Sequence, residues 1–324
     1  MEVLQLKGLL ERAAPDWKRV QEIRLRAGKP VALLIDGAEW VLSERGGLFE
    51  SPGGMGERPV LAEGRLLKEI LETVSRHSLY AYEEEIRQGF LTIEGGHRLG
   101  ISGHVVAEGE EIRTIRDISS LNLRLAHEIK GCADAVLPWL VSEGEFLDTL
   151  ILSPPGAGKT TLLRDLVRQL SDGSRYAPGK QVSVVDERSE IGASFRGVPQ
   201  CDVGMRTDLM DGCPKEAGML RMLRSMGPQI LAVDEVGTRA DLEALLYGMN
   251  CGCKILATAH GTSIGDIRRK PVLKDMARER LFSRYVVLSG RPVPGTVAGI
   301  YDGDLGMVPG WGEPPAAPGG KRES

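Results

Sequence analysis

One segment, Ser153 to Thr161, constrains the fold of this chain more than any other. It follows the apolar run Leu150-Ile151-Leu152. It precedes apolar residues that are spaced to lie on one side of a helix, which are Leu162, Leu163, Leu166, Val167 and Leu170. We therefore expect a strand, a glycine-containing loop and a helix in direct succession. In that geometry the loop amides and the helix N-terminus converge on an anion, so the segment predicts a site for the phosphate groups of a nucleotide.

The residue types within the segment fit this chemistry. Gly156 and Gly158 would let the backbone approach a phosphate, Lys159 would reach the β- and γ-phosphates of ATP, and Thr160 would be a ligand of Mg²⁺. Ser153 departs from the usual G-x-x-x-x-G-K-[ST] motif, because it occupies the first glycine position. The residues predicted to bind the nucleotide are Ser153, Pro154, Pro155, Gly156, Ala157, Gly158, Lys159, Thr160 and Thr161.

Apolar strands alternate with helices after this loop. The strands are expected at residues 150–152, 181–185, 230–233, 254–258 and 285–288, and helices are expected near residues 217–226 and 242–249. Apolar strands without polar alternation, separated by helices, indicate a parallel sheet with both faces covered. The expected fold class is α/β, with a RecA-like parallel sheet covered by helices on both faces and an α+β N-terminal domain.

Polar residues follow three of these strands. Asp234 and Glu235 end the strand at 230–233, and an acid at the Asp234 position would hold Mg²⁺ directly or through water. Glu235 suits a general base that polarises the attacking water, and Glu187 competes with it for that role. His260 could bind the γ-phosphate and report its loss, although a buried structural histidine fits the sequence nearly as well. Lys159, Glu187, Glu235 and His260 are the predicted catalytic residues.

An arginine from a neighbouring subunit could stabilise negative charge in the transition state. Arg206, Arg221 and Arg224 are candidates, although each is also explained as an ordinary surface residue.

The first part of the chain mixes helices with β-hairpins. A hairpin is expected where residues 31–35 are followed by Asp36-Gly37 and then residues 40–42. Residues 117–140 are expected to form a connector with an amphipathic helix that ends near Pro138. We expect an N-terminal domain and connector at residues 1–130, a nucleotide-binding domain at 131–308 and a disordered, Pro- and Gly-rich tail at 309–324.

Composition excludes several classes of protein. The 324 residues carry a formal net charge of −4, which gives no general attraction to nucleic acid or to an anionic membrane. Aromatic residues make up 5% of the chain, too few to favour a groove that tracks a single strand, although Arg268-Arg269-Lys270 is a small basic patch. No apolar run approaches the roughly 20 residues that cross a bilayer. We expect a cytoplasmic protein, with peripheral attachment to the inner face of a membrane as the alternative.

Several motifs, in order along the chain, resemble those of the stage III sporulation protein AA family. The matching segments lie at residues 22–26, 85–89, 95–98, 118–122, 151–165, 185–191, 202–208, 211–215, 233–237 and 258–261. This resemblance implies a RecA-like ATPase related to the motors of type II and type IV secretion and pilus systems. It also implies a ring of identical subunits, with six as the expected number, and membrane partners that form a channel between mother cell and forespore.

The function expected from residues and resemblance together is ATP hydrolysis that energises this channel, with Mg²⁺ as cofactor and no nucleic-acid partner. Two alternatives stay open: an ATPase stimulated by nucleic acid, and a scaffold that binds ATP without useful turnover. A phosphoryl transferase is less favoured, since Glu235 suits the activation of water and no acceptor site is evident in the sequence.

Overall fold

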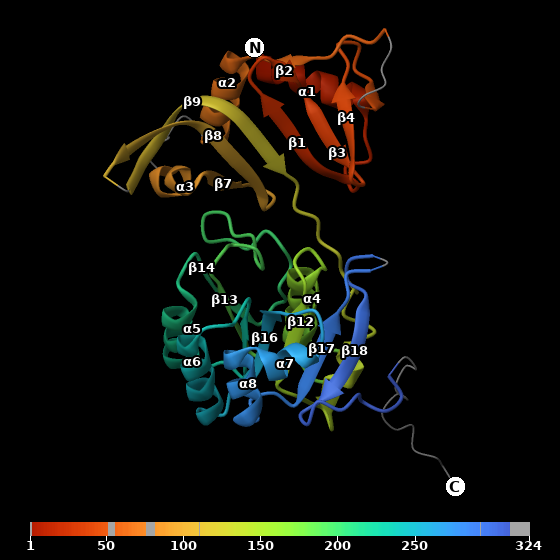
Figure 1. The fold of residues 1–324 in the computed structure, drawn as a ribbon, viewed down its shortest axis with the longest axis vertical. Helices are drawn as coiled ribbons and strands as arrows, with labels where there is room; N and C mark the ends of the chain where they lie inside the picture. Colours follow the sequence, from red (N-terminus) through yellow and green to blue (C-terminus); the bar gives the residue numbers. More distant parts are fainter. Residues whose placement is uncertain (1, 51–55, 76–81, 110, 292, 312–324) are drawn as a thin grey trace. The chain divides into compact units, whose positions relative to one another are not determined.

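The computed structural model describes residues 2–50, 56–75, 82–109, 111–291 and 293–311. The chain divides into two compact units, Met1–His127 and Glu128–Ser324 (Figure 1). Each unit has its own hydrophobic core, and each is described separately below.

The first unit is built on an antiparallel sheet. Its strands run in the order β5-β4-β3-β1-β9-β8-β7. Its elements are α1 (Glu2–Ala13), β1 (Val20–Arg26), β2 (Lys29–Pro30), β3 (Ala32–Ile35), β4 (Ala38–Leu42), β5 (Leu48–Glu50), β6 (Leu61–Ala62), α2 (Gly64–Val74), α3 (Glu83–Gln88), β7 (Phe90–Ile93), β8 (His97–Glu108) and β9 (Glu111–Arg124). The predicted hairpin is confirmed, because Asp36 and Gly37 link β3 to β4 with φ angles of +50° and +81°.

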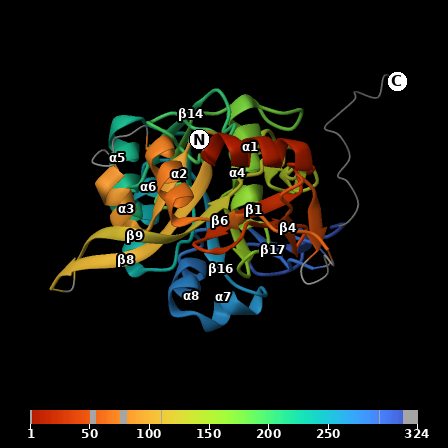
Figure 2. The same ribbon diagram turned by 90° about the horizontal axis from the view of Figure 1, so that it is seen from above.

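Helices α1 and α2 lie next to each other over this sheet (Figure 2). Leu6 and Leu9 of α1 and Leu67 of α2 are buried in one core with Leu33 of β3 and Leu121 of β9. The alternation of buried and exposed residues along β1 places one face of the sheet on this core.

The expectation of a connector with a helix at residues 117–140 is wrong for residues 117–124 and wrong for the helix, whereas residues 125–136 form no helix or strand and agree with a connector. Residues up to Arg124 continue β9, which pairs with β1 and β8. Asp117 does not end the strand: its φ is +45°, and the pairing shifts there, as in a β-bulge. Instead of an amphipathic helix, the later part holds turns and a short 3₁₀ helix, η2 (Leu137–Trp139).

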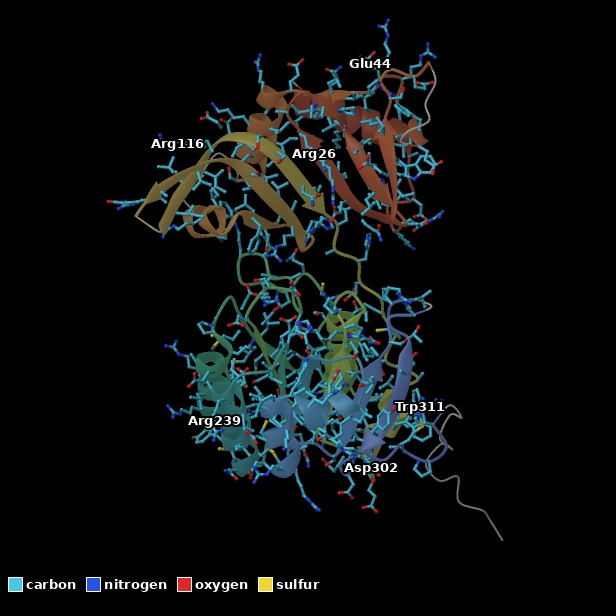
Figure 3. All side chains as sticks on the ribbon, viewed as in Figure 1. Arg26, Glu44, Arg116, Arg239, Asp302 and Trp311 are labelled. Atoms are coloured by element: carbon cyan, nitrogen blue, oxygen red, sulfur yellow. The ribbon has the colours of Figure 1, made fainter. Side chains whose placement is uncertain are left out.

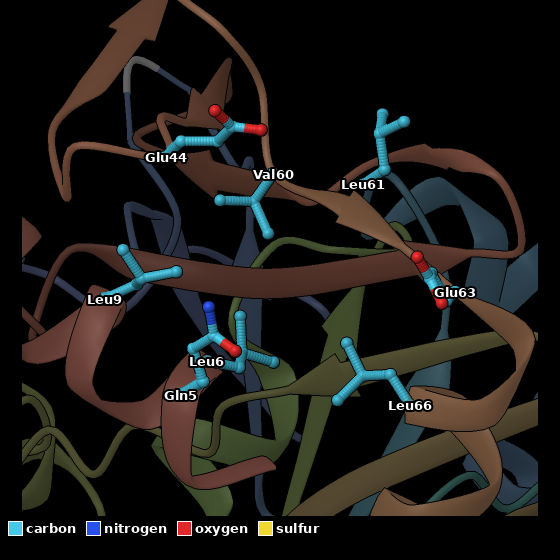
Figure 4. Close-up of a pocket in the computed structure, with 8 residues that line it drawn as sticks. All are labelled: Gln5, Leu6, Leu9, Glu44, Val60, Leu61, Glu63 and Leu66. Carbon is cyan, nitrogen blue, oxygen red and sulfur yellow. The ribbon is translucent and has the colours of Figure 1, made fainter. Parts of the chain in front are cut away.

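A hollow of about 570 Å³ with a mixed polar and apolar lining opens between α1, α2 and the segment that contains β6 (Figure 4). Leu6, Leu9 and Leu66 line it, and Glu44 and Glu63 also contribute to its lining.

The second unit is built on a mainly parallel sheet. The strand order is β14-β13-β15-β16-β12-β17-β18, and only the edge strand β18 runs antiparallel to its neighbour. Its elements are β10 (Val141–Ser142), β11 (Glu145–Phe146), β12 (Thr149–Ser153), α4 (Lys159–Asp172), β13 (Val182–Asp186), β14 (Thr207–Asp211), α5 (Lys215–Ser225), β15 (Ile230–Val233), α6 (Arg239–Asn250), β16 (Lys254–His260), α7 (Gly265–Arg269), α8 (Pro271–Arg278), β17 (Arg284–Leu288) and β18 (Val297–Asp302).

Both faces of this sheet are covered, which confirms the predicted α/β fold class. Ile151 of β12 packs in a core with Leu163 and Leu166 of α4 on one face. Its neighbours in sequence, Leu150 and Leu152, belong to the core on the other face, which also holds residues of α5, α6, α7 and α8. Strands β14 and β18 are not among the strands expected from sequence. Both lie at sheet edges and lack a run of buried apolar residues, since β14 has no buried residue and β18 has only Gly299 and Ile300 buried.

The chain remains packed up to Trp311, although the disordered tail was expected from residue 309. The Trp311 ring, which is labelled in Figure 3, meets that of Trp139 edge to face, with centroids 5.8 Å apart. Residues 312–324, the rest of the predicted tail, lie outside the described residues.

Candidate functional site

The loop between β12 and α4 has the backbone shape that the sequence predicts. Gly156 and Gly158 have φ angles of +73° and +87°, which glycine adopts without strain. Gly158 is the N-cap of α4 and provides no side-chain cap, so side chains do not occupy the amides at the helix N-terminus. Exposed amides beside a helix N-terminus suit a phosphate.

The loop also rests on the chain that links β17 to β18. The N–H group of Gly295 donates a hydrogen bond to the carbonyl of Ala157 over 2.8 Å. A Cβ atom on Gly158 would lie 2.9 Å from the backbone nitrogen of Gly295, and one on Gly290 would lie 2.8 Å from the Cβ of Ala157. Position 158 therefore requires glycine for two reasons, the close packing against this connection and the positive φ angle.

Ser153, the residue that departs from the usual motif, is the last residue of β12 and is fully buried. Its hydroxyl donates to the carbonyl of Pro154 over 2.7 Å. The side chain therefore has a partner within the loop's own backbone. Pro155 is exposed and Thr161 is partly buried.

Lys159 and Thr160 face the acids at the end of β15. Lys159 Nζ donates to Glu235 Oε1 over 2.8 Å and lies 3.4 Å from Asp234 Oδ1, although Lys159 is only 8% exposed. Thr160 Oγ1 donates to Asp234 Oδ2 over 3.0 Å, and the hydroxyl of Thr258 on β16 donates to the other oxygen of Asp234. The structure thus brings together the predicted phosphate-binding and acidic residues.

Glu235 is at the centre of this arrangement. Its Oε1 contacts Lys159 and lies 3.1 Å from His260 Nε2, while its Oε2 lies 2.8 Å from Arg188 Nη1. Burial raises the pKa of Glu235, but the hydrogen bond from Lys159 and the charges of Lys159 and Arg188 outweigh it, so the pKa lies below its ordinary value. Glu235 is therefore an ionised carboxylate at neutral pH.

The two acids at the end of β13 have different surroundings. Asp186 is buried and accepts hydrogen bonds from the amides of Glu190, Ile191 and Gly192, so it holds the following loop in place. Burial raises the pKa of Asp186 to about 6, against the effect of these amides. Glu187 is more exposed and pairs with Lys215 Nζ over 3.0 Å.

His260 lies at the exposed end of β16, with 49% of its side chain exposed. The alternative of a buried structural histidine is therefore wrong. The three arginines considered as donors to another subunit lie elsewhere: Arg206 donates to the carbonyl of Ser171, Arg224 lies over the ring of Tyr247, and Arg221 is exposed on α5.

Sequence reasoning missed Arg188, Lys215 and Thr258 as parts of the site. Arg188 and Thr258 have a recognisable signal, because each lies at or just beyond the carboxyl end of a strand next to a predicted site residue. Lys215 begins α5, and no strand end marks it.

The basic patch is largely engaged within the second unit. Arg269 pairs with Asp266 over 2.8 Å, and Lys270 Nζ donates to the carbonyl of His260 over 2.6 Å. Arg268 is therefore left as the exposed member of the three without such a contact among the described residues.

The donor set fits a magnesium nucleotide. Mg²⁺ is usually held by one or two protein oxygens together with phosphate oxygens and water, and Thr160 and Asp234 offer such oxygens 3.0 Å apart. Within the described ranges, His, Cys, Asp and Glu side chains form no cluster of three or more that could hold a metal by themselves. None of the described helices is both long and apolar enough to cross a bilayer.

Solved structures with the same fold include a pilus retraction motor and an ATPase. The pilus retraction motor PilT, solved with ADP, matches with a TM-score of 0.53 and 16% identity over 88% of this chain and 77% of PilT. The ATPase DotB of Yersinia pseudotuberculosis matches with a TM-score of 0.55 and 12% identity over 89% of this chain and 74% of DotB. These similarities show that the chain shares the RecA-like fold of these two proteins.

Relatives in sequence identify the family more specifically than the solved structures do. Stage III sporulation protein AA of Bacillus subtilis is 42% identical over 288 residues, which span 89% of this chain and 88% of the relative. Protein SEEDLING PLASTID DEVELOPMENT 1 of Arabidopsis thaliana is 29% identical over 48% of this chain and 22% of its own length. The family model described as "Sporulation stage III, protein AA" matches residues 1–308. The chain therefore belongs to the sporulation stage III protein AA family.

Proposed function

We propose that this protein hydrolyses ATP with Mg²⁺ as cofactor, and that rings of identical subunits use the reaction as a motor in sporulation. The single observation that carries the proposal is the convergence of Lys159 and Thr160 of the phosphate loop on Asp234 and Glu235. The family and the ATPase fold support the same reading.

The residues have separate roles in this proposal. The loop amides from Gly156 to Thr160 and the Lys159 ammonium would bind the phosphates. Thr160 and Asp234 would hold Mg²⁺, which supplies positive charge against the negative charge that develops on the phosphate oxygens.

Glu235 would orient the attacking water and accept its proton. The water oxygen forms a bond to the γ-phosphorus as the bond from that phosphorus to the β,γ-bridging oxygen breaks, which yields ADP and phosphate. We favour Glu235 over Glu187 as the base because Glu235 contacts Lys159, whereas Glu187 pairs with Lys215.

Substrate binding must rearrange the carboxylate contacts. Lys159 Nζ is held by Glu235 and Asp234. A phosphate that accepts the hydrogen bond of Lys159 in place of Glu235 would therefore free one oxygen of Glu235 to accept a proton. His260, 3.1 Å from the same oxygen, is placed to respond to this change. Loss of the γ-phosphate would reverse the exchange and drive movement of the first unit relative to the second.

The proposed partners are further copies of the chain and membrane proteins of a channel between mother cell and forespore, with the protein at the cytoplasmic face of the mother-cell membrane. The family carries this part of the proposal.

Phosphate release from ATP by the purified protein, measured across a protein concentration series, tests hydrolysis and assembly together. We expect the rate per subunit to rise with protein concentration. We also expect Glu235→Gln to lower the rate of phosphate release by about 100-fold or more while ATP still binds. Release that is equal in wild type and Glu235→Gln would refute the assignment. Strong stimulation by single-stranded DNA at physiological salt would favour the nucleic-acid alternative instead.

A further inference from the structure

Lys215 links three parts of the site, although its sequence position does not reveal this. It is the first residue of α5, and only 15% of its side chain is exposed. Its ammonium lies 3.0 Å from Glu187 Oε2, beyond the end of β13, and donates over 3.1 Å to the main-chain carbonyl of Glu235, beyond the end of β15. One partly buried cation therefore contacts both residues that compete for the role of general base.

Glu235 has a strained backbone. Its φ of +54° lies in the left-handed region, which is energetically unfavourable for a residue with a side chain. The surroundings hold this conformation from both sides: the N–H of Glu235 donates to Thr258 Oγ1 over 2.9 Å, and Lys215 binds the carbonyl. Strain that several contacts maintain next to a reactive group is typical of a positioned side chain.

The same residues line a small cavity. Glu187, Lys215 and Glu235 contribute to its wall, together with Asp186, Arg188, Glu190 and Asp234. Its volume of about 10 Å³ is close to what one water molecule needs, and the wall offers both donors and acceptors. Both carboxylates thus border one polar space, which Lys215 also lines.

We propose that Lys215 is a positioning residue for ATP hydrolysis: it holds the backbone of Glu235 in the left-handed conformation and engages Glu187, so that Glu235 is the carboxylate presented to water. This inference rests on the proposed function and adds a residue to it. Lys215 acts through Glu235, not on the substrate, so its loss should affect the rate of the chemical step and not the affinity for ATP.

The test compares Lys215→Met and Lys215→Arg with Lys180→Met as the matched control. Lys180 is similarly buried, with 13% of its side chain exposed, and pairs with Glu145 over 2.9 Å near the opposite ends of the strands. ATP affinity is measured by calorimetry, and phosphate release is measured in single turnovers. We expect Lys215→Met to slow release about 100-fold with ATP affinity within about threefold of wild type, because a misplaced catalytic group costs about that much.

Lys215→Arg should release phosphate at least tenfold faster than Lys215→Met, since it keeps the charge. Lys180→Met should match wild type in both ATP affinity and phosphate release.

A Lys215→Met protein with the wild-type rate of phosphate release would overturn the proposal. So would a loss of ATP affinity as large as the loss of rate, because that would place Lys215 in substrate binding. If wild type itself released no phosphate, the proposed function would fail first, and the wild-type measurement identifies that case.

Discussion

Lys159 of the predicted phosphate loop contacts two acids. Its Nζ is shared by Glu235 and Asp234 at 2.8 and 3.4 Å. Such a charged hydrogen bond is worth about 1.5–3 kcal/mol in a partly buried site, so a substrate must provide a better anion. A triphosphate with its several negative charges does so.

Lys159→Ala should lower the affinity for ATP by about 10- to 100-fold, because one charged hydrogen bond to phosphate is lost. Calorimetric titration of ATP into the folded variant measures this, with circular dichroism to show that the fold is kept and Lys180→Ala as the control. An affinity equal to that of wild type would contradict the assignment of the phosphate loop.

Glu235 also links stability to pH. Its pKa in the folded protein lies below the ordinary value, so the folded protein binds fewer protons at this site than the unfolded chain does. Its contribution to stability is therefore present above the unfolded pKa of about 4.5 and is lost as the pH falls through the lower, folded pKa.

Glu235→Gln removes the charge and keeps the size of the side chain. We expect it to lower the free energy of unfolding at pH 7 in the absence of nucleotide, and the difference from wild type to shrink as the pH falls below 4.5. Urea unfolding at a series of pH values measures this. A difference that stays constant over the series would show that the charge of Glu235 does not stabilise the fold.

At the scale of elements, the phosphate loop depends on the connection between β17 and β18. Gly158 and Gly295 both have a φ of +87°. A Cβ on Gly158 would have other atoms within 4 Å, including the Gly295 nitrogen, whereas a Cβ on Gly295 would have none. A comparison of alanine variants at the two positions therefore separates the free-energy cost of backbone strain from that of a steric clash.

Gly295→Ala should lower the free energy of unfolding by about 1–2 kcal/mol from left-handed strain alone. Gly158→Ala should lower it by a further 1–3 kcal/mol, roughly, because the clash forces the loop and the connection apart. It should also weaken ATP binding, since the loop moves. Urea unfolding and ATP titration of both variants measure these effects, and equal losses of stability would mean that the contact yields without cost.

At the scale of the whole molecule, each unit has its own core, and all the predicted site residues lie in the second unit. Its sheet is covered on both faces by its own helices. Nothing in the described packing of this sheet requires residues from the first unit.

A fragment of residues 128–324 should therefore fold alone and bind ATP. Thermal unfolding followed by circular dichroism should give one cooperative transition, and the same fragment with Lys159→Ala is the control for specific ATP binding. A fragment that lacks a cooperative transition would show that the second unit needs the first to fold.

The sequence predicted the fold class and most of the site because both depend on patterns of residues that are close together in the sequence. Apolar strands followed by Ser153, Asp234 and His260 mark the ends of parallel strands, and the β-sheet register then brings these ends together. The Asp36-Gly37 turn was likewise predictable, since positive φ angles select those residues. The edge strands β14 and β18 and the bulge at Asp117 have no such local signal.

The amino-acid order alone determined that a glycine loop between a strand and a helix would face two acids at the end of another strand. Only the tertiary structure decided which side chains surround Glu235, because Arg188, Lys215 and His260 reach it from separate elements. It also decided that Asp186 holds a loop while Glu187 pairs with a lysine. Adjacent residues on a strand end face different environments, and side-chain charge is set by those neighbours in space.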